Sequence, residues 1–166
     1  LLDVVIDGKK RKIIDQSSKQ AFLYVLDRKT GEPIWPIEEK PAPQIPITPG
    51  EKLSATQPIP TKPLPFDIQG LTDDTFINFS PELKNYAKNL MEKINRETGL
   101  SYGDLFTPIS LKGTILLPSR YGGSNWSGNS ANPETGIIFV PSHSRTDFAH
   151  NEKVPNNPKF DQLKLM

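Results

Sequence analysis

An apolar segment that runs into a tight turn and then a tryptophan constrains the fold of this chain most strongly. Residues 21–26 are apolar and of strand length, and Asp27-Arg28-Lys29-Thr30-Gly31 follows, with Trp35 four residues after the glycine. Short apolar strands bounded by turn residues are typical of all-β folds. The pattern therefore predicts part of a β-sheet blade. Lys19 stands at the entrance of the strand and is the residue we expect to touch a cofactor if the strand lines a pocket.

Further strands are predicted on both sides of this segment. Residues 2–6 and 10–14 flank Asp7-Gly8, a strong hairpin signal. Residues 15–20 are polar and are expected to form a loop. Strands resume at residues 113–118 and 137–140, and Asn132-Pro133-Glu134-Thr135-Gly136 repeats the position and role of the Asp27–Gly31 turn. Since propeller blades take roughly 40–50 residues each, the β portions amount to about two blades.

Proline dominates the region between the two β portions. Residues 33–65 hold 10 of the 17 prolines. Because proline has no backbone N–H to donate, this stretch cannot be a central strand, and we expect an extended loop laid over a surface. A disordered linker is the alternative, but the interspersed Ile, Leu and Phe residues favour a docked loop.

One helix is predicted at about residues 81–96. Ser80 suits the cap, Pro81 suits the first helical position and Glu82 complements the helix dipole. Its apolar residues recur at helical spacing and are expected to serve ordinary packing: Leu83, Tyr86, Ala87, Leu90, Met91 and Ile94. The expected organisation is blade strands at 1–35, a Pro-rich insertion with this helix at 36–111, blade strands at 112–141, and a polar loop or tail at 142–166.

Composition excludes several classes of function. The net charge of +1 gives no electrostatic footprint for nucleic acid, and no run of 18 apolar residues is present. The absence of cysteine excludes disulfides, thiolate metal sites and cysteine nucleophiles. The chain opens on a strand without an initiator Met, so we expect a segment of a longer chain.

Several motifs, in order along the chain, resemble the pyrroloquinoline quinone (PQQ)-dependent dehydrogenases, and within them the branch of the membrane glucose dehydrogenases. Asp27-x-x-Thr30-Gly31-x-x-x-Trp35 resembles the family's tryptophan-docking motif, and Lys19-Gln20-Ala21 resembles its Lys-Gln-Gly. Phe106-Thr107-Pro108-Ile109-Ser110 resembles its Phe-Thr-Pro-Pro-Ser, and Gly122-Gly123-Ser124-Asn125-Trp126 resembles its Gly-Gly-x-Asn-Trp. The resemblance implies an all-β fold: a segment of an eight-bladed quinoprotein propeller with a Pro-rich, helix-containing insertion.

The resemblance also implies a function. The chain would be part of a dehydrogenase that oxidises a sugar or alcohol by hydride transfer to PQQ, in the periplasm, with a quinone or cytochrome as electron acceptor and the remaining propeller blades as partners. Lys19 matches the family's basic residue at the quinone oxygens, so it is the catalytic and cofactor-binding candidate. Asn125 and Trp126 match a loop that faces the cofactor. The family's catalytic Asp and its Ca²⁺ ligands have no counterpart in this chain, so neither a base nor a metal ligand is assigned.

Each assignment has a plainer alternative. Lys19 could be a solvated loop lysine, and Asn125-Trp126 could be a structural turn with a buried indole. His143 and His150 are too few for a metal site and are expected to be solvated. The alternative for the chain as a whole is a non-enzymatic, propeller-derived binding or structural segment.

Overall fold

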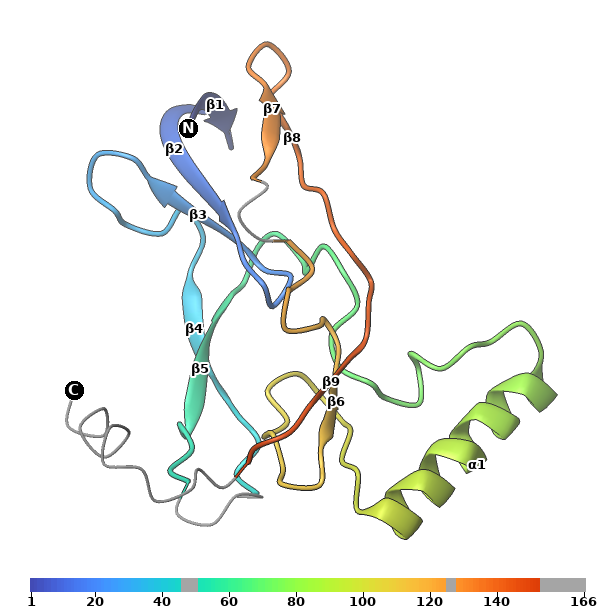
Figure 1. Ribbon diagram of the computed structural model, residues 1–166. Helices are drawn as coiled ribbons and strands as arrows, with labels where there is room; N and C mark the ends of the chain where they lie inside the picture. The colour runs from blue at the N-terminus through green and yellow to red at the C-terminus, as the bar shows by residue number, and fades with distance from the viewer. Residues whose placement is uncertain (46–50, 125–127, 153–166) are drawn as a thin grey trace.

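The computed structural model describes residues 1–45, 51–124 and 128–152. Within them, short antiparallel strands form one three-stranded sheet and several two-stranded ones, and a single helix projects away from them (Figure 1). The elements are β1 (Leu2–Ile6), β2 (Lys9–Ser17), β3 (Leu23–Asp27), β4 (Ile37–Pro41), β5 (Thr56–Pro60), α1 (Pro81–Thr98), β6 (Thr114–Leu116), β7 (Ser130–Asn132), β8 (Ile137–Phe139) and β9 (Asp147–Ala149).

The three-stranded sheet has the order β1-β2-β3. Its first hairpin turns at Asp7 and Gly8, with φ angles of 50° and 73°, as a two-residue turn between twisted strands requires. The predicted hairpin is therefore confirmed. The loop predicted over residues 15–20 is partly wrong, because β2 continues to Ser17, which pairs with Leu23. Polar side chains do not prevent a strand when a neighbouring strand takes its backbone hydrogen bonds.

An apolar cluster holds this sheet together. Leu2, Ile13, Leu23 and Val25 are buried, and Trp35 packs against them. Burial of such side chains is the main favourable term in folding, at about 25 cal/mol per Å² of apolar surface. The position of Trp35 supports a structural role for this residue.

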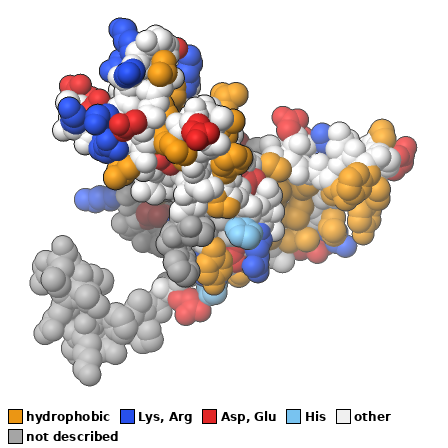
Figure 2. All heavy atoms as spheres, turned by 90° about the horizontal axis from the view of Figure 1, so that it is seen from above, with side chains coloured by type: hydrophobic (Ala, Val, Ile, Leu, Met, Phe, Trp, Pro, Cys, Tyr) orange, Lys and Arg blue, Asp and Glu red, His pale blue; other side chains and the backbone are white. Residues whose placement is uncertain are grey.

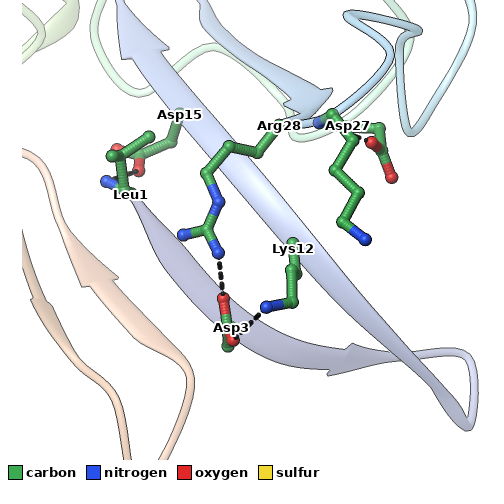
Figure 3. A network of polar contacts seen from close by, with 7 residues as sticks. Leu1, Asp3, Lys12, Asp15, Asp27 and Arg28 are labelled. Atoms are coloured by element: carbon green, nitrogen blue, oxygen red, sulfur yellow. Dashed lines mark hydrogen bonds and ion pairs between the residues drawn. The ribbon is translucent and has the colours of Figure 1, made fainter.

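Charged side chains of β1, β2 and the turn after β3 form ion pairs on the exposed side of the same sheet. Figure 3 shows Arg28 and Lys12 pointing toward Asp3 of β1, with N–O distances of 2.8 and 3.6 Å. These side chains are largely exposed, and exposed ion pairs contribute only about 0–1 kcal/mol. The apolar cluster, not the ion pairs, therefore fixes the sheet.

The two Thr-Gly turns have the same construction. The Asp27 carboxylate accepts hydrogen bonds from the N–H groups of Lys29 and Thr30, at 2.8 and 3.1 Å. Asn132 Oδ1 accepts from the second and third residues after it in the same way, at 2.9 and 3.2 Å. Gly31 and Gly136 close the two turns with φ angles of 78° and 71°. The internal repeat detected in the sequence therefore has a structural counterpart.

The proline-rich region contains a hairpin. β4 pairs with β5 in antiparallel register, with Pro41 opposite Thr56 and Ile37 opposite Pro60. The expectation of an extended loop is therefore wrong at these residues. Each strand of a two-stranded sheet has a free edge, and proline is tolerated where its missing N–H would face that edge.

Helix α1 begins and ends as its sequence indicates. The Ser80 hydroxyl accepts a hydrogen bond from Leu83 N–H at 3.3 Å, and Gly99 closes the helix with a φ of 74°. Its apolar stripe is packed only in part: Ala87, Met91 and Ile94 are partly buried, so the expectation of ordinary packing fails only for the other three residues. Leu83, Tyr86 and Leu90 are 46, 66 and 41% exposed. Figure 2 shows the hydrophobic side chains gathered on the projection that α1 forms.

The region after residue 142 is not all loop. β9 pairs with β6, with Ala149 opposite Thr114 and Asp147 opposite Leu116. The expected polar loop or tail is therefore wrong for residues 147–149. The predominance of strands agrees with the expected all-β class, whereas the blade count and the division into blades and insertion stay predictions. Across the described ranges, no helix combines the length and apolar character needed to cross a membrane.

Candidate cofactor site

Lys19 lies in a tight, well-bonded turn between β2 and β3. Ser18 N–H donates to the Phe22 carbonyl at 2.9 Å, and Ala21 N–H donates to the Ser18 carbonyl at 3.1 Å. Ala21 is completely buried in the left-handed region, at a φ of 66°. The turn thus fixes the backbone of Lys19, while its side chain remains exposed.

The segment Gly122–Ser124, the described start of the Gly-Gly-x-Asn-Trp motif, rests on this turn, and we call it the glycine-rich loop. Gly123 N–H donates to the Lys19 carbonyl at 3.0 Å, and the buried hydroxyls of Ser17 and Ser124 lie 3.2 Å apart. Gly122 has a φ of 89°, and a Cβ on it would lie 2.6 Å from Lys19 Cα. Only glycine permits this approach. The structure therefore brings together two motifs that lie about 100 residues apart in the sequence.

The other two predicted site residues follow directly in the sequence. Asn125 and Trp126 lie outside the described residues. Their role toward a cofactor stays a prediction.

A third segment, at residues 66–69, completes the arrangement. Phe66 N–H donates to the Ala21 carbonyl at 3.0 Å, and the Gln69 side chain donates to the Gln20 carbonyl. The Asp67 carboxylate accepts from the hydroxyls of Ser142 and Ser144. Sequence reasoning missed Asp67, because an aspartate at the end of a proline-rich run carries no signal that serines 75 and 77 residues away will bind it.

The carboxylate of Asp67 is held in its charged form. Burial acts to raise its pKa, but the hydroxyls of Ser142 and Ser144 outweigh it together with the Ile68 N–H and the nearby His143, and the pKa lies below its ordinary value. Several donors that converge on one carboxylate stabilise the charged state in this way.

A cavity of about 260 Å³ opens beside Lys19. Lys19, Arg120 and the acidic Asp104 line it, together with apolar groups that include Phe106 and Leu117. Arg120 Nε donates to Asp147 at 2.7 Å, and this bond lowers the pKa of the Asp147 carboxyl. Because Arg120 is already paired with Asp147, Lys19 is the cation of this lining that could meet an anionic group of a flat ligand, with the apolar residues beside its rings. A larger cavity, of about 730 Å³, lies over β1 and β2 and does not include Lys19, so it is a poorer candidate for the site.

His143 and His150 make contacts other than metal coordination. His150 Nε2 lies 2.9 Å from a Glu152 carboxylate oxygen, and the His143 backbone N–H donates to the Gly123 carbonyl at 2.8 Å. In the part of the chain that the structure describes, no group of three or more His, Asp or Glu residues is placed to hold a metal ion.

Comparison with known proteins finds a family model and several relatives that match most of this chain. The profile of the PQQ family "Glucose/ethanol/alcohol dehydrogenase, beta-propeller domain" matches residues 1–162. The chain is 30% identical over 161 residues to the glycerol dehydrogenase large subunit of Gluconobacter oxydans (strain 621H), covering 96% of this chain and 20% of that protein.

Two glucose dehydrogenases are similar to the chain as well. Quinoprotein glucose dehydrogenase A of Acinetobacter calcoaceticus is 33% identical over 127 residues, covering 74% of this chain and 15% of that protein. Quinoprotein glucose dehydrogenase of Escherichia coli (strain K12) is 31% identical over 147 residues, covering 84% and 17%. The chain therefore spans a fifth or less of the length of these relatives. No solved structure matches it significantly.

Proposed function

This chain belongs to the PQQ-dependent glucose, ethanol and alcohol dehydrogenase family, and from that premise we propose that it supplies part of the PQQ site of an enzyme that oxidises a sugar or an alcohol. The observation that carries the proposal is the seating of Gly122 and Gly123 on the Lys19 turn. Two motifs that resemble cofactor-facing segments thus meet at one place, beside a cavity with cationic and apolar walls.

The residues at this place suit the chemistry of the cofactor. PQQ is a flat tricarboxylate whose quinone, when bound, accepts the hydride that leaves the substrate. Lys19 would bring three N–H donors and a positive charge to the quinone oxygens, which is electrostatic stabilisation of the kind that dominates many enzymes. Arg120 lines the same cavity, but its Nε already donates to Asp147 at 2.7 Å, so Lys19 carries the proposed charge toward the cofactor.

Asn125 and Trp126 complete the proposed site. The Asn125 amide would donate to an oxygen of PQQ, and the Trp126 indole would form a flat apolar wall. Ca²⁺, the catalytic base, the quinone or cytochrome acceptor and the periplasmic location are proposed for the whole protein by analogy with the family. No residue of this chain is assigned to the metal or to the base.

The test is a titration of the full chain with PQQ and Ca²⁺, followed by tryptophan fluorescence. We expect saturable quenching that Lys19→Ala weakens by tenfold or more, on the order expected for loss of a charged hydrogen-bond partner. Lys93→Ala is the matched control, because Lys93 lies on α1, where it makes an exposed pairing with Glu97 at 3.9 Å. Equal binding by both variants would remove Lys19 from the site. A folded chain without quenching would instead favour a binding or structural segment.

A further inference from the structure

The segment from Phe66 to Gly70 connects parts of the chain that are far apart in sequence. Its residues bond to the Lys19 turn through the carbonyls of Ala21 and Gln20. Gly70 N–H donates to the carbonyl of Leu117 at 2.7 Å, and Leu117 lines the cavity beside Lys19. This segment, which we name the clasp (residues 66–70), therefore touches both the turn and the wall of the candidate site.

Asp67 extends the clasp toward the glycine-rich loop. Its carboxylate accepts from the hydroxyls of Ser142 and Ser144, the two residues that flank His143. The His143 N–H donates to the Gly123 carbonyl at 2.8 Å, and the Gly123 N–H donates to the Lys19 carbonyl at 3.0 Å. Hydrogen bonds, connected through the backbone of residues 142–144 and of Gly123, thus lead from Asp67 to the backbone of Lys19.

Close packing accompanies the path. A Cβ on Gly123 would lie 3.0 Å from Ser142 Oγ and 3.4 Å from the Asp67 carboxylate. Gly123 and Ser124 are buried, whereas Ser142 and Ser144 lie at the exposed end of the path. The Asp67 carboxylate binds this exposed segment at two points, which is possible because a carboxylate can accept several hydrogen bonds at once.

We infer that Asp67 is a positioning residue for the cofactor site: it holds residues 142–144 so that they press Gly123 onto the Lys19 turn. The inference rests on the proposed function in one respect: it expects PQQ to bind more weakly when Asp67 is replaced. Asp67 acts through other residues and is not itself assigned a contact with the cofactor.

The first test needs no cofactor. Amide hydrogen exchange is measured at Gly123 and His143 in the full chain and in Asp67→Ala. Loss of the two hydroxyl bonds should speed exchange at both amides by roughly tenfold to thirtyfold, because each hydrogen bond lost favours local opening by about fivefold. Asp67→Asn keeps one acceptor oxygen and should give a smaller effect.

The controls separate local from general loosening. Asp73→Ala removes an aspartate that pairs with Lys88 of α1, and it should leave the Gly123 amide unchanged. Amides of the β1–β2 hairpin should also keep their rates in Asp67→Ala. Unchanged exchange at Gly123, or an equal acceleration at every amide, would overturn the inference. The Ser142→Ala/Ser144→Ala double variant removes the same two hydrogen bonds by deleting their donors. It should speed exchange at Gly123 as much as Asp67→Ala does.

The second test measures the dissociation constant of PQQ. Asp67→Ala should weaken binding by about tenfold, and adding Ser142→Ala and Ser144→Ala should cause little further loss, because the three side chains act on one path. Wild-type binding with no effect of Asp67→Ala would contradict the inference and leave the proposed function intact. Absence of PQQ binding by the wild type would contradict the proposed function, while the exchange rates would still decide whether Asp67 holds the loop.

Discussion

Gly122 offers the sharpest test of how the site is assembled, because its backbone lies against that of Lys19. In Gly122→Ala, the new Cβ would lie 2.6 Å from Lys19 Cα and 2.7 Å from Lys19 Cβ. Both are atoms in or next to the backbone and cannot swing away as a side-chain tip could. The left-handed φ of 89° adds its own cost to any residue other than glycine.

The magnitude follows from these two effects. A left-handed conformation costs an L-residue about 1–2 kcal/mol, and overpacking a tight contact costs about 1–3 kcal/mol. Gly122→Ala should therefore lower the free energy of unfolding by about 2–5 kcal/mol. Gly31→Ala is the matched control, since Gly31 has a similar φ of 78° but a Cβ added to it would meet no atom within 4 Å. It should lose only the conformational part, about 1–2 kcal/mol.

Urea unfolding of the three proteins provides the assay, with the midpoint and slope fitted together. The difference between Gly122→Ala and Gly31→Ala isolates the clash with Lys19. If Gly122→Ala loses no more stability than Gly31→Ala, the glycine-rich loop does not press on the Lys19 turn and the assembly of the site described here is wrong.

Three further predictions concern single side chains. Thr114→Val should lower the free energy of unfolding by at least about 2 kcal/mol in urea denaturation, because the buried Thr114 hydroxyl bonds both Ser110 N–H at 3.0 Å and the Pro108 carbonyl at 2.9 Å, and valine leaves both unsatisfied. Asp27→Asn should make stability less sensitive to acid. The N–H groups that follow Asp27 lower the pKa of its carboxyl in the folded state. The charged carboxylate therefore stabilises the fold above the ordinary pKa of Asp, and this stabilisation is lost as the pH falls through the lowered value. Asparagine keeps the acceptor, as Asn132 does in the second turn, so an unchanged stability profile below about pH 4 would contradict this assignment. Ser80→Ala should reduce the helical circular dichroism signal and cost about 1 kcal/mol, and an unchanged signal would show that the cap contributes nothing.

Local signals in the sequence predict local structure well. Asp7-Gly8 marks its hairpin because both residues accept a positive φ, and Ser80 marks the start of α1 because its hydroxyl meets the N–H of Leu83. The Thr-Gly turns can be predicted equally well, since the side chain of the first residue of each turn accepts hydrogen bonds from the N–H groups that follow it. Each of these signals depends on atoms within a few residues.

Features that depend on residues far away in the sequence cannot be predicted from such local signals. β9 has only three residues, and nothing near Asp147 reveals that β6 will pair with it. The β4–β5 hairpin is hidden because proline argues against a strand unless the edge positions are known. Leu83 and Tyr86 follow helical periodicity correctly, but periodicity indicates a face and not what covers it.

The candidate site shows the same division. Lys19 and the glycine-rich loop could be singled out by resemblance to known motifs, and the structure brings the two together. Asp67 could not, because its role depends on Ser142 and Ser144, which carry no motif. Positions that hold a site in place leave a weaker trace in sequence than the positions that face the ligand.

The central claim is that Lys19 and the glycine-rich loop form one PQQ site, and a double-mutant cycle on PQQ binding tests it most directly. Calorimetric titration of the wild type, Lys19→Ala, Gly122→Ala and the double variant gives the four binding free energies. If the two segments act together, each single variant weakens binding and the double variant loses clearly less than the sum of the two losses. Strictly additive losses, or binding that neither substitution alters, would contradict the claim.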